Sequence, residues 1–361
     1  MEILHAKAGQ SSPIAVSDLI TTRGGSIGIG DPGSAGSPTN GANAAFIHVA
    51  PRSMPLPVLI AVPHAGRAYT GEVLAQMRDP ELSQLRLEDR HIDNVGVEIA
   101  RDTGTGLLVA HAPRAMLDLN RAHDDVDWDM IERPRRRMAM RPNETKETAP
   151  RMAGSNARAR SGLGLVPRRL PGFGEIWREK LSREELGQRI ETIHRPYHDF
   201  LEQELERIRD TWGAALLIDL HSMPPLRRQS AGRVGGTNYD GPAPQVVLGD
   251  RFGASCHSGL VAGAFRYLEE RGCAAAHNRP YSGGFVLDRH AAPQRGIHAL
   301  QLEICRSTYL DASLSEPTAA VKPLAAMLAG LVRKLGAETA GLGAGRQING
   351  YADGHAAQAA E

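Results

Sequence analysis

The chain has 361 residues, of which 41% are hydrophobic and 23% are charged, and its formal net charge is +1. This composition is ordinary for a soluble globular protein with a substantial core, and its charge gives no reason to expect a nucleic acid or an anionic membrane as a partner. Aromatic residues make up only 4%, which disfavours a base-stacking surface, and no apolar run reaches the length of a membrane span.

The cysteines and the N-terminal residues indicate a cytoplasmic location. Cys256, Cys273 and Cys305 are an odd number without CxxC spacing, so neither a disulfide framework nor a cysteine-rich zinc site is expected. The opening residues, MEILHAKAGQSSP, lack the basic and apolar regions of a secretory signal. A reducing compartment is therefore the expected environment.

Small residues dominate both ends of the chain. Residues 22–44 consist mostly of Gly, Ser, Pro and Asn, and Gly and Ala prevail from Gly336 onward. Such composition favours flexible segments over packed ones. We therefore expect a flexible N-terminal segment over residues 1–45, a single α/β domain over 46–335 and a flexible tail over 336–361.

Apolar strands alternate with helical periodicity between these two ends. The expected strands cover residues 58–62, 106–110, 115–119, 215–220, 245–248 and 299–304. Helical spacing covers residues 85–102, 183–211 with a kink at Pro196, 257–271 and 316–335. This alternation predicts an α/β fold with a mixed, largely parallel sheet covered by helices on both faces.

Polar side chains stand at or near the ends of four expected strands. They are His64 after residues 58–62, Asn120–Arg121 after 115–119, His221 after 215–220, and Glu303 near the end of 299–304. A further group, Glu88, Asp89, His91 and Asp93, stands at the start of the first expected helix. Because ligands of α/β sheets gather beyond the carboxyl ends of the strands, these groups mark a candidate site.

The residue types in this set suit a catalytic zinc ion. Imidazoles and a carboxylate are its usual ligands, and a buried acid such as Glu303 can take a proton from water activated by the metal. Taken singly, each residue also has a structural explanation: a strand-end histidine can form a hydrogen bond, and Arg121 can pair with Asp118 or Asp124. Their joint occurrence favours a site, and HExxH does not occur in the chain.

Several stretches resemble the N-formylglutamate amidohydrolase family, the N-formylglutamate deformylases. They are VPHAGRAY (62–69), EDRHID (88–93), LDLNR (117–121), GLGLVPR (162–168), HRPYH (194–198), IDLHSMP (218–224), LGDRFGASC (248–256), NRPYSGGF (278–285) and GIHALQLEICRSTYLD (296–311). They follow the family's order and span roughly residues 55–315. The resemblance implies a phosphorylase/hydrolase-like α/β fold related to the zinc carboxypeptidases.

The resemblance also implies a metal site. His64 and His221 match the histidine ligands of zinc. Arg67 stands where the carboxypeptidases have their acid, three residues after His64. The EDRHID segment must then supply the carboxylate; Asp89 is favoured, with Glu88 and Asp93 as alternatives.

The remaining roles follow from the same resemblance. Asn120 and Arg121 match a pair that binds the substrate carboxylate, Arg121 also supports the oxyanion, and Glu303 matches the general base. Arg168 and Tyr281 are expected to line the substrate pocket. The implied reaction converts N-formyl-L-glutamate to formate and glutamate, a step of histidine degradation. Alternatives are another N-acyl amino acid or a short peptide as substrate, or a binding protein without turnover.

Overall fold

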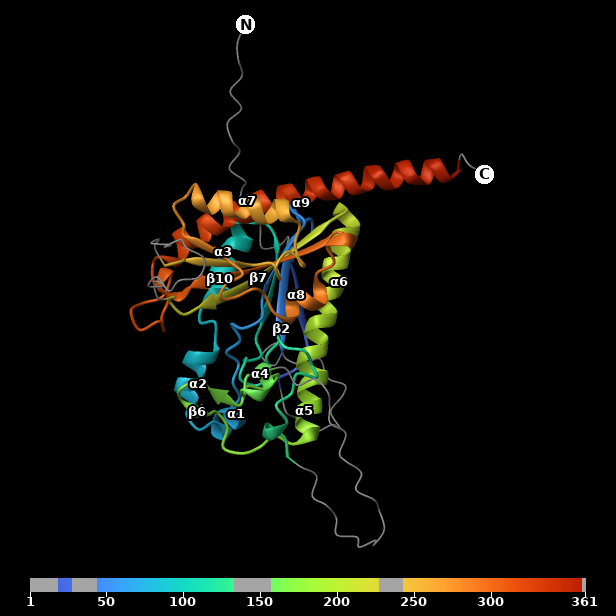
Figure 1. Ribbon diagram of the computed structural model, residues 1–361. Coiled ribbons are helices and arrows are strands. Elements are labelled where there is room, and N and C mark those ends of the chain that lie inside the picture. The colour runs from blue at the N-terminus through green and yellow to red at the C-terminus, as the bar shows by residue number, and fades with distance from the viewer. Residues whose placement is uncertain (1–18, 28–43, 133–156, 227–242, 359–361) are drawn as a thin grey trace, which may run out of the picture.

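The computed structural model describes residues 19–27, 44–132, 157–226 and 243–358 (Figure 1). Its main sheet contains eight strands in the order β1-β2-β4-β3-β7-β10-β8-β9. They are β1 (Leu19–Gly24), β2 (Phe46–Pro51), β3 (Val58–Val62), β4 (Gly106–Ala110), β7 (Ala215–Met223), β8 (Val246–Gly249), β9 (Ala275–His277) and β10 (Ile297–Cys305). A separate two-stranded sheet pairs β5 (Arg169–Leu170) with β6 (Gly174–Glu175).

The centre of the main sheet is parallel. Strands β4, β3, β7 and β10 pair in parallel, whereas β2 joins β4 and β1 joins β2 in antiparallel orientation. On the other side β8 is antiparallel to β10, and β9 is parallel to β8. The mixed, largely parallel sheet that the sequence predicts is therefore confirmed.

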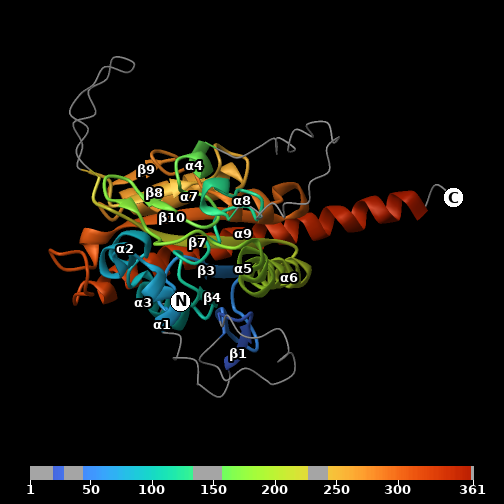
Figure 2. The same ribbon diagram turned by 90° about the horizontal axis from the view of Figure 1, so that it is seen from below.

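Helices cover both faces of this sheet (Figure 2). The helices are α1 (Gly71–Gln76), α2 (Pro80–Leu87), α3 (Ile92–Thr103), α4 (Ala157–Arg160), α5 (Arg183–Arg189), α6 (Arg195–Trp212), α7 (Ser258–Glu269), α8 (Phe285–His290) and α9 (Val321–Gln358), with short turns η3 (Trp128–Met130), η4 (Ile190–His194), η5 (Pro293–Arg295) and η6 (Arg306–Thr308). Helices α5, α6 and α8 pack on one face, and α3, α7 and α9 on the other. No helix in the described ranges is long and apolar enough to span a membrane.

The side chains of strand β3 contribute to the hydrophobic cores on both faces of the sheet. Its side chains alternate between the faces, so Leu59 and Ala61 join the core under α6, while Val58, Ile60 and Val62 join the core under α3 and α9. All five residues are buried. A run without polar interruption is what a strand covered on both faces requires.

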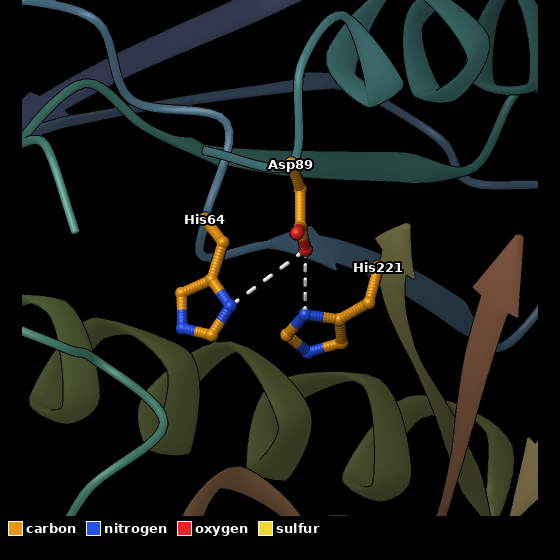
Figure 3. A group of neighbouring side chains, drawn as sticks. All are labelled: His64, Asp89 and His221. Carbon is orange, nitrogen blue, oxygen red and sulfur yellow. Dashed lines mark hydrogen bonds and ion pairs between the residues drawn. The ribbon is translucent and has the colours of Figure 1, made fainter. Parts of the chain in front are cut away.

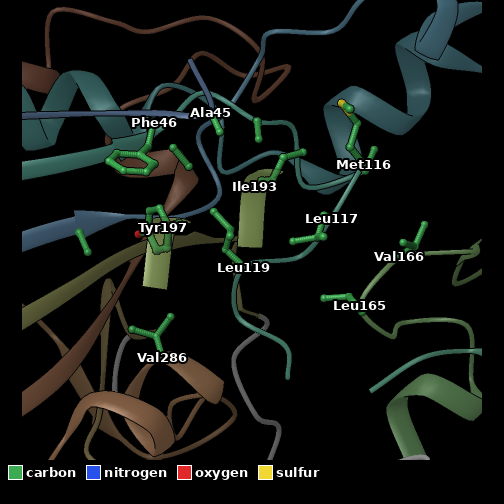
Figure 4. Packing of buried hydrophobic residues seen from close by; sticks show 14 of the residues in the cluster. Ala45, Phe46, Met116, Leu117, Leu119, Leu165, Val166, Ile193, Tyr197 and Val286 are labelled. Carbon is green, nitrogen blue, oxygen red and sulfur yellow. The ribbon is translucent and has the colours of Figure 1, made fainter. Parts of the chain in front are cut away.

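The segment Ala115–Leu119 is not a strand, and this expectation from the sequence is wrong. Its apolar residues belong to the core around Phe46 and Tyr197, whose rings meet edge to face at 5.8 Å (Figure 4). Their backbone turns instead of pairing with the sheet, because Met116 N donates to Pro113 O. Burial alone imposed the apolar pattern that resembles a strand.

The N-terminal segment contains ordered structure that its composition does not predict. Strand β1 adds to the sheet edge, and Ser26 N donates to Thr192 O at 2.8 Å. Thr192 lies four residues before Pro196, which has no N–H to bond to this carbonyl. The expected kink is accordingly a π-helical turn over Ile190–His194, and the N-terminal segment supplies the missing donor.

Helix α9 continues to Gln358, through most of the segment whose composition predicts a flexible tail from residue 336. The small residues serve close packing. A Cβ atom on Gly336 would lie 3.1 Å from Leu56, and one on Gly343 would lie 2.1 Å from the carbonyl oxygen of Trp212. Thr339 is completely buried. The composition that favoured disorder is here what lets a helix approach the sheet.

Candidate active site

Strands β7 and β10 place four polar side chains on one face of the sheet. In their parallel register Asp219 lies beside Gln301, and His221 lies beside Glu303. Side chains two residues apart share a face, so these residues continue the face that Leu217 contributes to the core. His221 lies within β7, which extends three residues beyond the predicted end at 220.

His64 and Asp89 reach the same place from two loops. His64 follows β3 by two residues, and Asp89 lies in a break between α2 and α3. The sequence predicts one helix over residues 85–102, but His91 adopts a left-handed conformation with φ 58° and interrupts it. Asp89 N donates to His64 O at 2.9 Å, which joins the two loops.

These loops and β7 bring His64, Asp89 and His221 together (Figure 3). All three are buried, and one potential ligand atom from each lies within 4.8 Å of the others. Asp89 Oδ2 is 3.0 Å from His221 Nδ1 and 3.7 Å from His64 Nδ1. Two imidazoles and one carboxylate in this arrangement form a group that could bind a metal ion.

Carboxylates also stand behind both imidazoles. Asp118 Oδ1 is 2.7 Å from His64 Nε2, and Asp219 Oδ2 is 3.0 Å from His221 Nε2. Carboxylates in this position orient metal-binding histidines and increase their basicity. His64 Nδ1 is buried without a hydrogen-bond partner among the described residues, as expected of an atom that binds a metal. The residues present therefore fit a metal ion.

The electrostatics of the group favour a cation between the rings. Burial raises the pKa of Asp89, but the hydrogen bond from His221 and the nearby ring of His64 outweigh it and hold the pKa well below its usual range. Burial lowers the pKa of His221, but Asp219 and Asp89 raise it well above its usual value. Each group is thus stabilised in its charged form by the opposite charge beside it.

The other two acidic side chains of the EDRHID segment, Glu88 and Asp93, each pair with an arginine. Glu88 Oε2 accepts from Arg90 Nη1 at 3.3 Å, and the Asp93 carboxylate pairs with Arg67 at 2.6 Å. The structure brings neither acid into the His64–Asp89–His221 group. Arg67 stands at the position where the carboxypeptidases have their acid. In this chain it pairs with Asp93.

Glu303 lies beside the histidine group in the same cavity. Gln301 Nε2 donates to Glu303 Oε1 at 2.9 Å and fixes the carboxyl group. Burial raises the pKa of Glu303 to about 7, although the positive charge of His221 opposes this shift. A carboxyl group with such a pKa can both accept and return a proton near neutral pH.

The cavity has a volume of about 170 Å³, below the ~300–1,000 Å³ typical of pockets for drug-sized ligands. Besides the metal group and Glu303, its lining includes Asn120, Arg121 and Tyr281. It therefore brings together every predicted site residue except Arg168. The guanidinium of Arg168 pairs with Asp127 and Glu175 at 2.7 and 2.8 Å, and Arg168 does not line the described cavity.

Three arginines of the cavity were missed from the sequence: Arg86, Arg114 and Arg306. Arg114 lines it and donates to Asp118, so it both supports His64 indirectly and presents positive charge. Arg306 donates to Asp89 Oδ1 at 3.3 Å and to the Glu88 carbonyl, and thereby holds the break that carries Asp89. The position of Arg306 just after β10 was an available signal. Arg114 had no such signal, because it precedes, and does not follow, the strand that the sequence predicts over residues 115–119.

Comparison with known proteins identifies the family. Residues 56–310 match the N-formylglutamate amidohydrolases. The chain belongs to this family. An N-formylglutamate deformylase of Pseudomonas putida is 32% identical, covering 71% of this chain and 82% of the relative, and one of Pseudomonas aeruginosa is 30% identical, covering 74% and 90%. The crystal structure of N-formylglutamate amidohydrolase from Ralstonia eutropha JMP134 superimposes with a TM-score of 0.68 at 29% identity, covering 82% of this chain and 98% of that one.

The family resemblance inferred from the motifs is thereby confirmed. The matched region, 56–310, contains every residue of the candidate site from His64 to Glu303. Strand β1 and helix α9, the two elements that composition did not predict correctly, lie outside it.

Proposed function

We propose that this chain is a zinc-dependent amidohydrolase that converts N-formyl-L-glutamate and water to formate and L-glutamate. We further propose that it acts in histidine degradation in the cytoplasm, where its three free, buried cysteines stay reduced. The observation that carries the proposal is the juxtaposition of a buried His-Asp-His group and an acid of pKa about 7 in one cavity. Membership in the family supports the substrate.

His64, Asp89 and His221 would hold the metal. A bound zinc ion supplies a Lewis acid for the amide carbonyl and lowers the pKa of a water molecule. Asp118 and Asp219 keep the two imidazoles oriented towards it. Two neutral imidazoles and one carboxylate are a common donor set of catalytic zinc.

Glu303 moves the proton. Its carboxylate accepts a proton as water attacks the formyl carbon, and the carboxyl group returns this proton to the amino nitrogen as the C–N bond breaks. Water thus supplies one of the two oxygens of formate, the formyl carbonyl keeps the other, and glutamate leaves with a neutral amine. The raised pKa suits both halves of this exchange at neutral pH.

Asn120 and Arg121 position the substrate by its α-carboxylate. Arg121 is held from behind, because its Nε donates to Leu163 O at 3.1 Å. Asn120 Oδ1 accepts from Val286 N at 2.9 Å, which orients its amide nitrogen for donation. Arg114 and Arg121 add positive charge near the developing oxyanion.

The test measures formate release by the purified full-length chain after metal removal and after addition of zinc. N-formyl-L-glutamate should be hydrolysed only by the zinc-loaded protein, and faster than N-acetyl-L-glutamate because the cavity is small. Faster hydrolysis of the acetyl or a longer acyl substrate would assign the site to another N-acyl amino acid. Zinc binding without hydrolysis of any amide would leave a binding protein.

A further inference from the structure

A second cavity adjoins the metal cavity, and the two share a wall. Its volume is about 370 Å³. Asn120 and Arg121 line both cavities, as do Ser282, Gly283 and Gly284. We call Asn120 and Arg121 the carboxylate clamp, because they are proposed to bind the α-carboxylate of the substrate. The clamp therefore lies between the metal cavity and a larger cavity that the proposed reaction does not use.

The chemistry of a formylated amino acid indicates what this space receives. On the acyl side of the scissile bond the carbonyl carbon carries only a hydrogen atom, which needs no room. On the amine side the Cα atom carries both the α-carboxylate and the side chain. When Asn120 and Arg121 bind the α-carboxylate, a side chain on the same carbon starts at the clamp, next to the second cavity.

Arg251 presents a cation to this cavity from a constrained turn. Arg251, Phe252 and Gly253 have successive φ angles of 54°, 56° and 89°, a conformation that the first two rarely adopt. Two contacts hold the turn: Arg251 N donates to Ser282 O at 2.8 Å, and Asp250 N donates to Asn278 Oδ1 at 3.0 Å. Strained backbone that its surroundings hold in place is typical of functional sites.

Two glycines of the shared wall, Gly283 and Gly284, lie close to Arg251 and to Asn120. A Cβ atom on Gly283 would lie 3.0 Å from Arg251 Cδ, and one on Gly284 would lie 2.5 Å from Asn120 Oδ1. Glycine at these positions therefore lets the Arg251 side chain and the Asn120 amide both contact the wall.

The contacts of the guanidinium leave part of it for a ligand. Arg251 Nε is 2.5 Å from Asp288 Oδ1, and Arg251 Nη1 donates to Gly283 O at 3.4 Å. Arg251 Nη2 makes no hydrogen bond to the residues that the structure describes, and Arg251 lines the cavity. The other charged residues of its lining are Arg121 and Asp125, whose closest side-chain atoms are 4.0 Å apart. Asp288 beside Arg251 and Asp125 beside Arg121 balance the two cations of this lining. A carboxylate that enters beside Arg251 would therefore be recognised by hydrogen bonds from its guanidinium group and not by an excess of positive charge.

We propose that Arg251 binds the side-chain carboxylate of the substrate, so that the second cavity selects acidic N-formyl amino acids. This inference rests on the proposed function, since it assumes that Asn120 and Arg121 bind the α-carboxylate.

The experiment compares N-formyl-L-glutamate with N-formyl-L-glutamine, which has the same shape without the charge. In R251Q, kcat/KM for the glutamate substrate should fall roughly 10- to 100-fold, the range expected for a hydrogen bond to a charged group, while that for the glutamine substrate stays within about threefold. R289Q is the matched control: Arg289 is a half-buried arginine on the adjacent helix α8, pairs with Glu202 at 3.2 Å and lines neither cavity. It should leave the preference unchanged.

R251N keeps the test decisive if R251Q does not fold, because asparagine tolerates the left-handed backbone better. An equal loss on both substrates, or an unchanged preference, overturns the proposal. So does loss of the preference in R86Q instead, since Arg86 lines the metal cavity outside the shared wall. If the unaltered protein deformylates neither substrate, the proposed function fails, a result distinct from all of these.

Discussion

In the described part of the chain, two groups of neighbouring buried histidines differ in what their ring nitrogens face. In the metal group, His64 and His221 face the carboxylates of Asp89, Asp118 and Asp219. In the second group, which we call the α6 histidine cluster, His194, His198 and His290 face backbone carbonyls and one another. Both groups are buried, so burial does not distinguish them.

The rings of the α6 histidine cluster are neutral, because burial lowers the pKa of all three, and neutral rings satisfy their hydrogen bonds. Leu119 O can only accept, so His198 Nε2 carries a proton and donates to it at 3.0 Å. His198 Nδ1 then accepts from His290 Nε2 at 2.9 Å. His194 Nε2 donates to Arg121 O at 2.9 Å. The cluster thus holds the backbone on both sides of Asn120 by neutral hydrogen bonds.

The comparison shows that partner chemistry decides what a buried histidine can do. Carboxylates beside His221 raise its pKa well above the usual value against the effect of burial. Without such partners, burial lowers the pKa of His194 to about 4 and that of His290 to about 3. The first group attracts a cation and the second excludes one, although both serve the same cavity. Four predictions test this distinction.

The largest expected effect is on metal content. H221A should lose bound zinc and at least about a thousandfold of activity, because it removes one of the three proposed ligands. H198A, which truncates an equally buried histidine, should retain stoichiometric zinc. Elemental analysis of both purified variants, with formate release, makes the measurement. Zinc retained by H221A, or lost from H198A, would show that the two groups are assigned wrongly.

Glu303 should separate catalysis from metal binding. E303Q preserves the size and the contact with Gln301 but removes the proton acceptor, so kcat should fall about 10²- to 10⁴-fold. Its zinc content should match that of the unaltered protein. Turnover close to the unaltered rate would remove Glu303 as the base.

The carboxylates behind the imidazoles should have a smaller effect. D219N should weaken zinc binding about 10- to 100-fold, because Asp219 no longer supplies charge to His221. E204Q is the control, since Glu204 lies 3.8 Å from His48 in another buried histidine–acid pair. Competition with a chelator of known affinity gives the dissociation constants. Equal weakening in both variants would indicate a general loss of stability instead of an effect on the metal site.

Sequence patterns located much of this site because the fold places strand ends together. His64, His221 and Glu303 stand at or near strand ends in the chain, and parallel pairing of β3, β7 and β10 brings these strands side by side. That step needs only periodicity and the geometry of a parallel sheet.

Other parts of the site depend on tertiary contacts that periodicity does not encode. The apolar spacing of residues 85–102 runs through the break that carries Asp89, which Arg306 holds from a distant strand end. Arg168 is predicted to line the substrate pocket, but the sequence around it does not reveal that Asp127 and Glu175 pair with its guanidinium. Likewise, the Gly and Ala content of α9 is compatible with both a frayed and a packed helix. Its packing depends on contacts with Trp212 and Gly213, which are distant in the sequence.

The smallest effect concerns acid stability of the α6 histidine cluster. An unfolded histidine has a pKa near 6.5, whereas burial, and secondarily Arg289, lower that of His290 to about 3. The unfolded state therefore binds protons first as pH falls, and this histidine's contribution, fully present above pH 6.5, is lost progressively towards pH 3. Its slope approaches one proton, about 1.4 kcal/mol per pH unit, once pH is well below 6.5.

H290Q removes this titration while its amide nitrogen can still donate to His198 Nδ1. Urea unfolding of the zinc-loaded proteins between pH 7.5 and 5 should therefore show a pH slope shallower by up to one proton in H290Q than in the unaltered chain. The metal group contributes equally to the pH slope of both proteins, so the difference between the two slopes reports on His290 alone. Identical slopes would mean that His290 is protonated in the folded protein, and the cluster would then no longer contrast with the metal group.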